Sequence, residues 1–179
     1  MGVSVRGYSN CKVSSAFIVD ADGEAVDAKT GEIADYDSVL RFYIHPAFPG
    51  RADDIDCDAV YECEGSVLGF SASYFAYNEW RNILAMLAGY PRARVGEEDR
   101  EHAYCIACWN GATGPFSELI NFSDCEGTIG TSVATKLAKD FADYQEKVDH
   151  FHDPVFVRRY NSMREAFEAA THNGAVRFT

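Results

Sequence analysis

FSELINFSDCEGTIGT, residues 116–131, is the stretch around which the rest of the chain is organised. A short apolar run at 118–122 breaks at a polar segment with two acids and two glycines, and an amphipathic helix follows at once. We therefore expect a strand, a loop and a helix in succession. The N-terminus of a helix presents backbone N–H groups that lack partners, so we expect ligand chemistry at this central loop, residues 123–131.

The helix after the central loop has the clearest pattern in the chain. Its apolar face consists of five residues at helical spacing: Val133, Leu137, Phe141, Tyr144 and Val148. A second unit of the same kind comes earlier, where a strand at 59–70 leads into a helix at 74–88 that Ser71 or Ser73 can cap. We expect the loops that lead into these two helices to lie at the same end of the sheet.

Short strands are expected elsewhere. Asp22-Gly23 between β-prone residues predicts a hairpin, and apolar runs predict strands at 39–45, 104–109 and 118–122. Residues 1–11 show little periodicity, and no regular element is expected there.

A last helix begins at Asp153-Pro154, which fit the N-cap and first helical positions, and residues 175–178 return as an edge strand. The order of elements, β-rich first and helical late, predicts a single α+β domain over residues 1–179. Its sheet should be mixed but mainly antiparallel, with three helices. Residues 1–70 form an acidic β-rich part, and residues 71–179 hold the two strand-loop-helix units and the C-terminal helix.

Composition excludes some classes of protein. The chain has 28 acidic and 16 basic residues, and residues 1–70 alone hold 13 acidic and 5 basic residues. Nucleic-acid binding needs clustered Lys and Arg to neutralise phosphates, so we predict no nucleic-acid partner. No apolar run approaches the roughly 20 residues of a membrane span, and the first residues lack the pattern of a secretory signal. We therefore expect a cytoplasmic protein with no membrane partner.

The six cysteines are expected to be reduced, small and buried, because no secretory signal accompanies them. Cys105 and Cys108 form a C-x-x-C pair inside an apolar run, where we expect burial without metal. With Cys57 and Cys63 they would offer four thiolates to zinc, but the second pair is spaced more widely than paired zinc ligands usually are.

Three aspartates at alternate positions, Asp54, Asp56 and Asp58, resemble part of a calcium loop. Ala59 stands where an EF-hand needs glycine, and Gly65 stands where it needs glutamate, so an EF-hand is excluded. A solvated acidic loop is the better interpretation.

The candidate ligand-binding residues all belong to the central loop: Ser123, Asp124, Glu126, Gly127, Gly130 and Thr131. The two carboxylates and the helix amides would hold a small polar ligand or a hard cation, and the glycines permit backbone conformations that a Cβ forbids. The alternative is a tight connection whose acids cap the following helix. Cys125 is less favoured as a nucleophile, because the flanking carboxylates would raise the pKa of its thiol. Any of the five histidines could approach it in space.

Tyr74, Tyr77, Trp80 and Arg81 cluster at the start of the earlier helix. If exposed, such a patch of aromatic residues and arginine would mark an interface with another protein. The alternative is that these residues belong to the core, as helical aromatic residues commonly do.

Two segments together resemble a group of uncharacterised bacterial and phage or prophage proteins. They are SYFAYNEWR with LAMLAGY, at 73–81 and 84–90, and LINFSDCEGTIG with KLAKDF, at 119–130 and 136–141. The group shares an S-D-C-[ED]-G loop, which corresponds here to residues 123–127. This resemblance implies that the two units belong to one module and favours a phage-related accessory role. It implies no activity and no cofactor.

These features favour a non-enzymatic binding or inhibitor protein, phage-encoded, that acts on a host protein or sequesters a small polar ligand at the central loop. The acidic N-terminal part would face a basic partner. Two alternatives stay open: a metal-assisted hydrolase that uses Asp124 and Glu126, and a structural or assembly component. Metal content and oligomeric state also stay open.

Overall fold

The computed structural model describes residues 2–35, 39–95 and 103–179 of the chain. The predicted α+β fold is confirmed: the main sheet has four antiparallel strands in the order β4-β1-β6-β5, and a smaller sheet pairs β2 with β3. The strands are β1 (Gly2–Val13), β2 (Phe17–Val19), β3 (Ala25–Asp27), β4 (Tyr61–Ser73), β5 (Gly127–Gly130) and β6 (Ala175–Phe178). The helices are α1 (Tyr74–Leu87), α2 (Cys105–Trp109), α3 (Ser117–Ile120), α4 (Thr131–Asp149) and α5 (Pro154–Ala170). The three long ones, α1, α4 and α5, are those that the sequence predicts.

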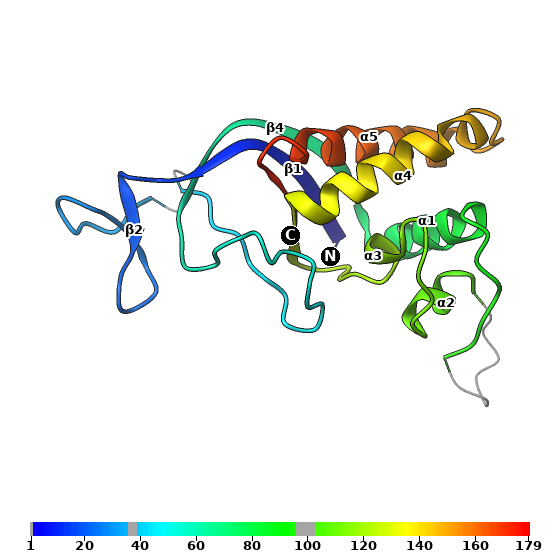
Figure 1. Ribbon diagram of the computed structural model, residues 1–179, viewed down its shortest axis with the longest axis horizontal. Helices are drawn as coiled ribbons and strands as arrows, with labels where there is room; N and C mark the ends of the chain where they lie inside the picture. Colours follow the sequence, from blue (N-terminus) through cyan, green and yellow to red (C-terminus); the bar gives the residue numbers. More distant parts are fainter. Residues whose placement is uncertain (1, 36–38, 96–102) are drawn as a thin grey trace.

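β1 is a long central strand, although residues 1–11 show little periodicity. It pairs with β4 along its whole length, from Gly2 opposite Ser73 to Val13 opposite Tyr61. β6 pairs with β1 on one side and β5 on the other, so the prediction that it is an edge strand is wrong. The two ends of the chain meet in this sheet (Figure 1), where both backbone hydrogen bonds between Ser4 and Thr179 form.

Helices α4 and α5 lie side by side along one face of the sheet (Figure 1). α5 packs against β1 and β4, and glycine allows the close approach, since a Cβ on Gly7 would lie 2.1 Å from the carbonyl oxygen of Ala166. The Tyr160 hydroxyl on α5 donates a 2.6 Å hydrogen bond to the carbonyl of Phe141 on α4. Both rings are fully buried, so this pair of helices encloses the main core.

The opposite face of the sheet carries a smaller core. Cys11, Phe42 and Ala175 are buried there, with Leu40 and Ile55 packed against them. Ala175 and Val176 face opposite sides of β6, and Val176 belongs to the main core. Residues 40–55 therefore cover part of the sheet on the side away from α5.

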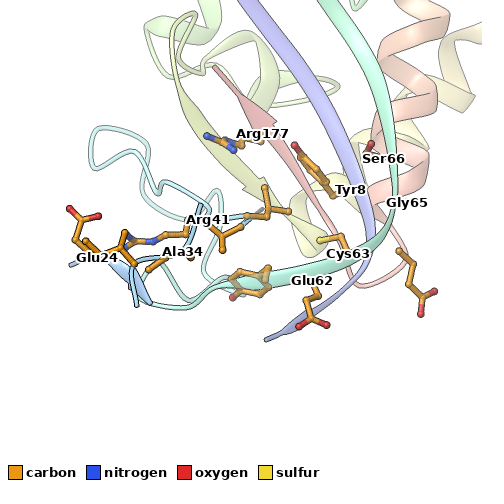
Figure 2. Close-up of a pocket in the computed structure, with 15 residues that line it drawn as sticks. Tyr8, Glu24, Ala34, Arg41, Glu62, Cys63, Gly65, Ser66 and Arg177 are labelled. Carbon is orange, nitrogen blue, oxygen red and sulfur yellow. The ribbon is translucent and has the colours of Figure 1, made fainter. Parts of the chain in front are cut away.

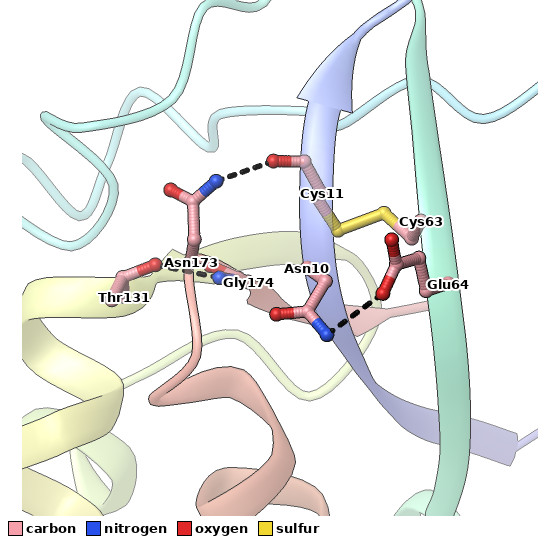
Figure 3. The surroundings of a disulfide bond; sticks show 7 residues. All are labelled: Asn10, Cys11, Cys63, Glu64, Thr131, Asn173 and Gly174. Carbon is pink, nitrogen blue, oxygen red and sulfur yellow. Dashed lines mark hydrogen bonds between the residues drawn. A yellow bond between two sulfur atoms is a disulfide. The ribbon is translucent and has the colours of Figure 1, made fainter.

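A disulfide joins Cys11 of β1 to Cys63 of β4, which are direct partners in the strand register (Figure 3). The prediction that all six cysteines are reduced is therefore wrong for this pair. Their 52-residue separation hides a contact that exists only once the two strands have paired. Cys105 and Cys108 are buried and free, as predicted, whereas Cys57 and Cys125 are free but exposed.

The apolar runs at 104–109 and 118–122 are predicted to be strands, but they overlap the short helices α2 and α3. The prediction is wrong for both runs. All four residues from Cys105 to Cys108 are buried, and a run that is covered on every side fits a helical turn as well as a strand. The run at 39–45 is also not a strand, and it contributes an isolated bridge between Leu40 and Tyr61.

The predicted helix starts are largely confirmed. The Ser73 hydroxyl accepts a hydrogen bond from the N–H of Ala76 at the start of α1, and the Asp153 carboxylate accepts from Val155 and Phe156 at the start of α5. The β2–β3 hairpin around Gly23 also forms as predicted. None of the described helices is both long and apolar enough to cross a membrane.

Candidate functional site

The central loop forms one wall of a cavity of about 590 Å³. The other walls come from α1, from the end of α2 and from the segment around residue 45. The lining residues are His45, Ala47, Phe48, Asn78, Arg81, Trp109, Asn121, Phe122, Ser123, Asp124, Cys125 and Glu126. Three of the six predicted ligand-binding residues, Ser123, Asp124 and Glu126, therefore share one cavity.

A buried arginine holds the central loop from behind. Arg81 is 3% exposed, and its Nη1 donates to the carbonyls of Phe122, at 2.5 Å, and Ile120, at 3.3 Å. Its Nη2 donates to Asn78 and lies 3.8 Å from the Asp124 carboxylate. Helix α1 thereby fixes the chain just before the loop and at Asp124, and the charge of Arg81 is engaged by groups of the protein itself.

Asp124 is bound to α1 rather than to the helix that follows the loop. Its Oδ2 accepts a 2.9 Å hydrogen bond from the Asn78 amide. Partial burial opposes ionisation, but the hydrogen bonds from Asn78 and Cys125 and the nearby Arg81 outweigh it and lower the pKa of the carboxyl. Asp124 is therefore an ionised carboxylate at neutral pH, with one side chain of α1 already attached to it.

Ser123 shapes the loop from within. Its side-chain oxygen accepts hydrogen bonds from the backbone N–H groups of Cys125, at 3.2 Å, and Glu126, at 3.1 Å. Ser123 is buried, while Cys125 and Glu126 are exposed. This turn leaves the carboxylate of Glu126 exposed on the loop, where it makes no hydrogen bond or ion pair with any residue that the structure describes.

The Cys125 thiol is poorly suited to act as a nucleophile. It lies 3.4 Å from Oδ1 of Asp124, and the hydrogen bond to this carboxylate raises the pKa of the thiol. His45 lines the same cavity, whereas His102 lies outside the described residues. Because the thiol is protonated at neutral pH, the prediction that the neighbouring acids disfavour this role agrees with the geometry.

Aromatic residues line the same cavity as the acids. The ring centroid of Phe48 lies 5.1 Å from that of Phe122 and 4.9 Å from that of His45. Trp109 is anchored by a 3.2 Å hydrogen bond from its indole Nε1 to the carbonyl of Ile120, yet its side chain is 44% exposed. We call this site the acidic–aromatic cavity, after the carboxylates of Asp124 and Glu126 and these aromatic residues.

Gly130 and Thr131 do not belong to this cavity. Strand β5 separates them from the cavity. Gly127 at its start lies opposite Phe178 of β6, whereas Gly130 at its end lies opposite Ala175, three residues earlier in β6. The hydroxyl of Thr131 exchanges two hydrogen bonds with the backbone of Gly174 (Figure 3). The predicted six-residue ligand site is thus divided between the two ends of a strand, and the Thr131 hydroxyl serves the fold.

Asp54 caps the helix that follows the central loop. Its Oδ2 accepts a 2.8 Å hydrogen bond from the N–H of Ser132, and a Cβ on Gly130 would lie 1.7 Å from its Oδ1. The alternative in which the loop acids cap α4 is therefore wrong. The capping carboxylate comes from a segment 78 residues earlier in the chain.

The start of α1 and the central loop lie at the same end of the sheet, as predicted, because the Asn78 amide reaches Asp124. The start of α4 lies at the other end, because β5 runs between the loop and that helix. Ser73 and Asp124 therefore lie at the same end of the sheet, as predicted, whereas the starts of α1 and α4 lie at opposite ends.

The predicted interface patch is not exposed. Tyr77 and Trp80 are 0% and 2% exposed and stack with ring centroids 6.0 Å apart, and Arg81 is buried beneath the loop. Burial also raises the pKa of Tyr77 to about 12. Tyr74 is half-buried beside Cys125. The core alternative is the correct one for Tyr77 and Trp80, and Arg81 serves the central loop.

The structure does not bring the considered metal ligands together. Cys63 is in the disulfide, Cys57 is exposed, and burial raises the pKa of Cys108 to about 11, so a four-thiolate zinc site is excluded. Among the described residues, one group of three potential ligands lies within 4.8 Å: the exposed Asp56, Cys57 and Asp58. Asp124 and Glu126 do not form such a group with any other residue in the part of the chain that the structure describes.

Several cavity residues were missed by sequence reasoning: His45, Phe48, Asn78, Trp109 and Asn121. His45 and Phe48 flank Pro46 in a segment that looked like a strand end, and Trp109 closes an apolar run that looked like core. Asn78 lies four residues after Tyr74 on the same helical face, and this spacing is the one signal that could have linked it to the loop end of α1.

Comparison of the chain with protein-family models, with curated proteins and with solved structures found no match. A larger cavity, of about 800 Å³, opens between the main sheet and the β2–β3 hairpin, away from the central loop.

Proposed function

We propose that this protein is a non-enzymatic binding protein that holds a small polar ligand in the acidic–aromatic cavity, and that the ligand carries a cationic group. The single observation that carries the proposal is the combination of an uncompensated carboxylate, Glu126, with a half-exposed indole, Trp109, on the walls of one cavity. A cationic ligand would cover the apolar surface of the indole and bring its charge to the carboxylate of Glu126.

The charge of the cavity favours a cation. Asp124 is compensated by Asn78 and Arg81, while Glu126 has no partner among the described residues. The one basic residue in the lining, Arg81, is committed to two backbone carbonyls and to Asn78. A cationic group would therefore meet an unopposed negative charge at Glu126.

The aromatic wall favours the same class of ligand. A tryptophan side chain that is 44% exposed leaves a large apolar surface in water, and aromatic faces attract ammonium and guanidinium groups. Phe48 lines the same cavity and adds a second aromatic ring to that of Trp109. Aromatic rings beside a carboxylate are the arrangement that recognises organic cations in proteins.

The geometry favours binding over catalysis. Cys125 is held as a thiol by Asp124, and Asp124 is occupied by Asn78. A metal-assisted hydrolase that uses Asp124 and Glu126 stays an alternative, but a third ligand from the described residues would have to move to complete such a site. Binding to a host protein also stays an alternative, although burial of Tyr77, Trp80 and Arg81 removes the surface that suggested it.

Isothermal titration calorimetry with choline tests the proposal. The control ligand is its uncharged carbon analogue, in which a tert-butyl group replaces the trimethylammonium group. We expect saturable binding of choline and none of the analogue, with affinity reduced about tenfold in Glu126→Gln, the effect of losing about 1.4 kcal/mol. Glu146→Gln, on the exposed face of α4, is the matched control and should bind like the wild type. Equal binding by Glu126→Gln and wild type would overturn the proposal.

A further inference from the structure

Two arginines lie directly opposite each other on the face of the sheet that turns away from α5. Arg6 of β1 and Arg177 of β6 are register partners, so their side chains leave the sheet on the same face. Their neighbours Gly7 and Val176 are also register partners, and Gly7 meets Ala166 of α5 on the other face. The arginine pair is therefore separate from the main core and from the acidic–aromatic cavity.

Neither arginine has an acidic partner among the described residues. Arg6 donates from Nη1 to the Ser66 hydroxyl at 3.2 Å, and the half-buried guanidinium of Arg177 makes no hydrogen bond or ion pair with any of these residues. Like charges placed directly opposite each other across a sheet are destabilising. Among the described residues this pair stays unopposed although the chain has 28 acidic and 16 basic residues, and an anion bound beside the pair would stabilise it.

Arg177 lines the larger cavity, and Arg6 reaches its edge through its hydrogen bond to Ser66, which also lines it. Figure 2 shows Arg177 and Tyr8 reaching into it from the sheet, and Arg41 on the opposite side, beside the hairpin. Arg41 donates from Nη1 to the carbonyl of Gly23 at 2.6 Å, which ties this side of the cavity to the hairpin turn. The hydroxyl of Tyr8 makes no hydrogen bond with the described residues, so it is a further free donor. The volume of about 800 Å³ is ample for a small organic molecule.

The carboxylates in the lining do not neutralise Arg177. Glu62 accepts a 2.7 Å hydrogen bond from the Ser14 hydroxyl and lies 3.6 Å from Lys12, and Glu64 accepts from the Asn10 amide at 3.0 Å. Glu24 lies on the hairpin side near Arg41, away from Arg177 (Figure 2). At the end of the cavity that the sheet forms, Glu62 and Glu64 are therefore held by other side chains, whereas the charge of Arg177 has no partner among the described residues.

We propose that this cavity is a second binding site, which takes a small organic anion with a carboxylate or phosphate group. The guanidinium groups of Arg177 and Arg6 present forked donors that match such groups, and the Tyr8 hydroxyl adds a donor beside them. The rings and aliphatic groups of Tyr61 and Leu40 line the same cavity and would cover the apolar part of the ligand. The ligand bridges β1 and β6 to the hairpin and relieves the repulsion between the arginines.

Calorimetric titration of the full chain with phenyl phosphate tests this site. We expect wild-type binding to saturate below about 10 mM, and Arg177→Gln and Arg6→Gln each to weaken it by about tenfold. Arg158→Gln, at an exposed position of α5, is the matched control and should leave binding unchanged. Inorganic phosphate should bind more weakly with the same dependence on Arg177, and uncharged benzyl alcohol should not bind.

Two results would overturn the second site. One is wild-type protein that shows no saturable binding of phenyl phosphate; the other is binding that survives in both Arg177→Gln and Arg6→Gln. Arg6 is exposed, so its variant reports on the site even if Arg177→Gln fails to fold. Choline binding at the acidic–aromatic cavity should be unchanged in Arg6→Gln, which separates failure of this inference from failure of the proposed function.

Discussion

Replacing Asp124 with alanine should destabilise the protein, because this carboxylate fastens the central loop to α1. The substitution removes the 2.9 Å hydrogen bond from the Asn78 amide and the 3.8 Å approach to Nη2 of Arg81. It leaves the hydrogen bonds from Arg81 to the Phe122 and Ile120 carbonyls in place. We therefore expect partial loosening of the loop rather than loss of the fold.

The magnitude follows from the burial of the two partners. A hydrogen bond to an ionised group stabilises a protein by about 1.5–3 kcal/mol when buried, and an exposed ion pair contributes at most about 1 kcal/mol. The Asp124 side chain is 36% exposed and that of Arg81 4%, so solvent screens one end of the contact. We expect a loss of about 1–2 kcal/mol in the free energy of unfolding. For a chain of this length, that lowers the melting temperature by about 2–8 °C.

A double-mutant cycle with Asn78→Ala assigns the loss to this contact. Urea unfolding of the two single variants and the double variant should give a coupling energy of about 1 kcal/mol, because each single change already removes the shared hydrogen bond. Asp143→Ala is the matched control, since Asp143 pairs with Lys139 on the exposed face of α4 and should contribute about 0.5 kcal/mol or less. An Asp124→Ala loss no larger than that of the control, or additive losses in the cycle, would refute the assignment.

Three further outcomes test the electrostatics and the disulfide. The folded pKa of Asp124 is lowered, so its stabilising contribution is full above the unfolded pKa of about 3.9 and is lost as pH falls through the folded pKa. The urea stabilities of wild type and Asp124→Ala should therefore converge as pH falls through the folded pKa; a constant difference would contradict this. Replacing Cys11 and Cys63 with serine should cost about 2–4 kcal/mol, since the bond closes a loop of 52 residues, and unchanged thermal stability would argue against the bond. Asp124→Asn should lower the pKa of Cys125 and speed its alkylation by iodoacetamide, with exposed Cys57 as internal control; equal rates at Cys125 would show that the carboxylate does not hold this proton.

The long helices and their starts could be read from the sequence, because their signals are local. The apolar face of α4 repeats at helical spacing, and Ser73 and Asp153 cap their helices through hydrogen bonds that span two or three residues. The β2–β3 hairpin could also be predicted, because the turn signal at Gly23 is local. Each of these elements depends on contacts between near neighbours in the chain.

Features that depend on distant contacts could not be read in this way. β1 is central because it pairs with strands far away in the sequence, as Val5 does with Phe70, 65 residues later, and with Phe178, 173 residues later. The cap of α4 comes from Asp54, a residue that looked like part of a solvated acidic loop. The sequence predicts a strand where α2 forms, because nearly all of its residues are buried. Such burial removes the periodicity that distinguishes a helix from a strand.

The candidate site was located by its loop but not by its walls. Ser123, Asp124 and Glu126 could be chosen from a polar break in an apolar pattern. The aromatic wall is supplied by Phe48 and Trp109, which no local signal connects to the loop. Disulfides such as the one between Cys11 and Cys63 are rare in reducing compartments, and the cytoplasmic location stays a prediction.

A crystal structure of the protein grown with choline tests the central claim most directly, because it asks whether a cation occupies the acidic–aromatic cavity. The proposal predicts density for the trimethylammonium group against the Trp109 indole and beside the Glu126 carboxylate, with Asp124 still bound to Asn78. A structure in which choline saturates the crystal but lies elsewhere, while ordered water fills this cavity, would contradict the claim.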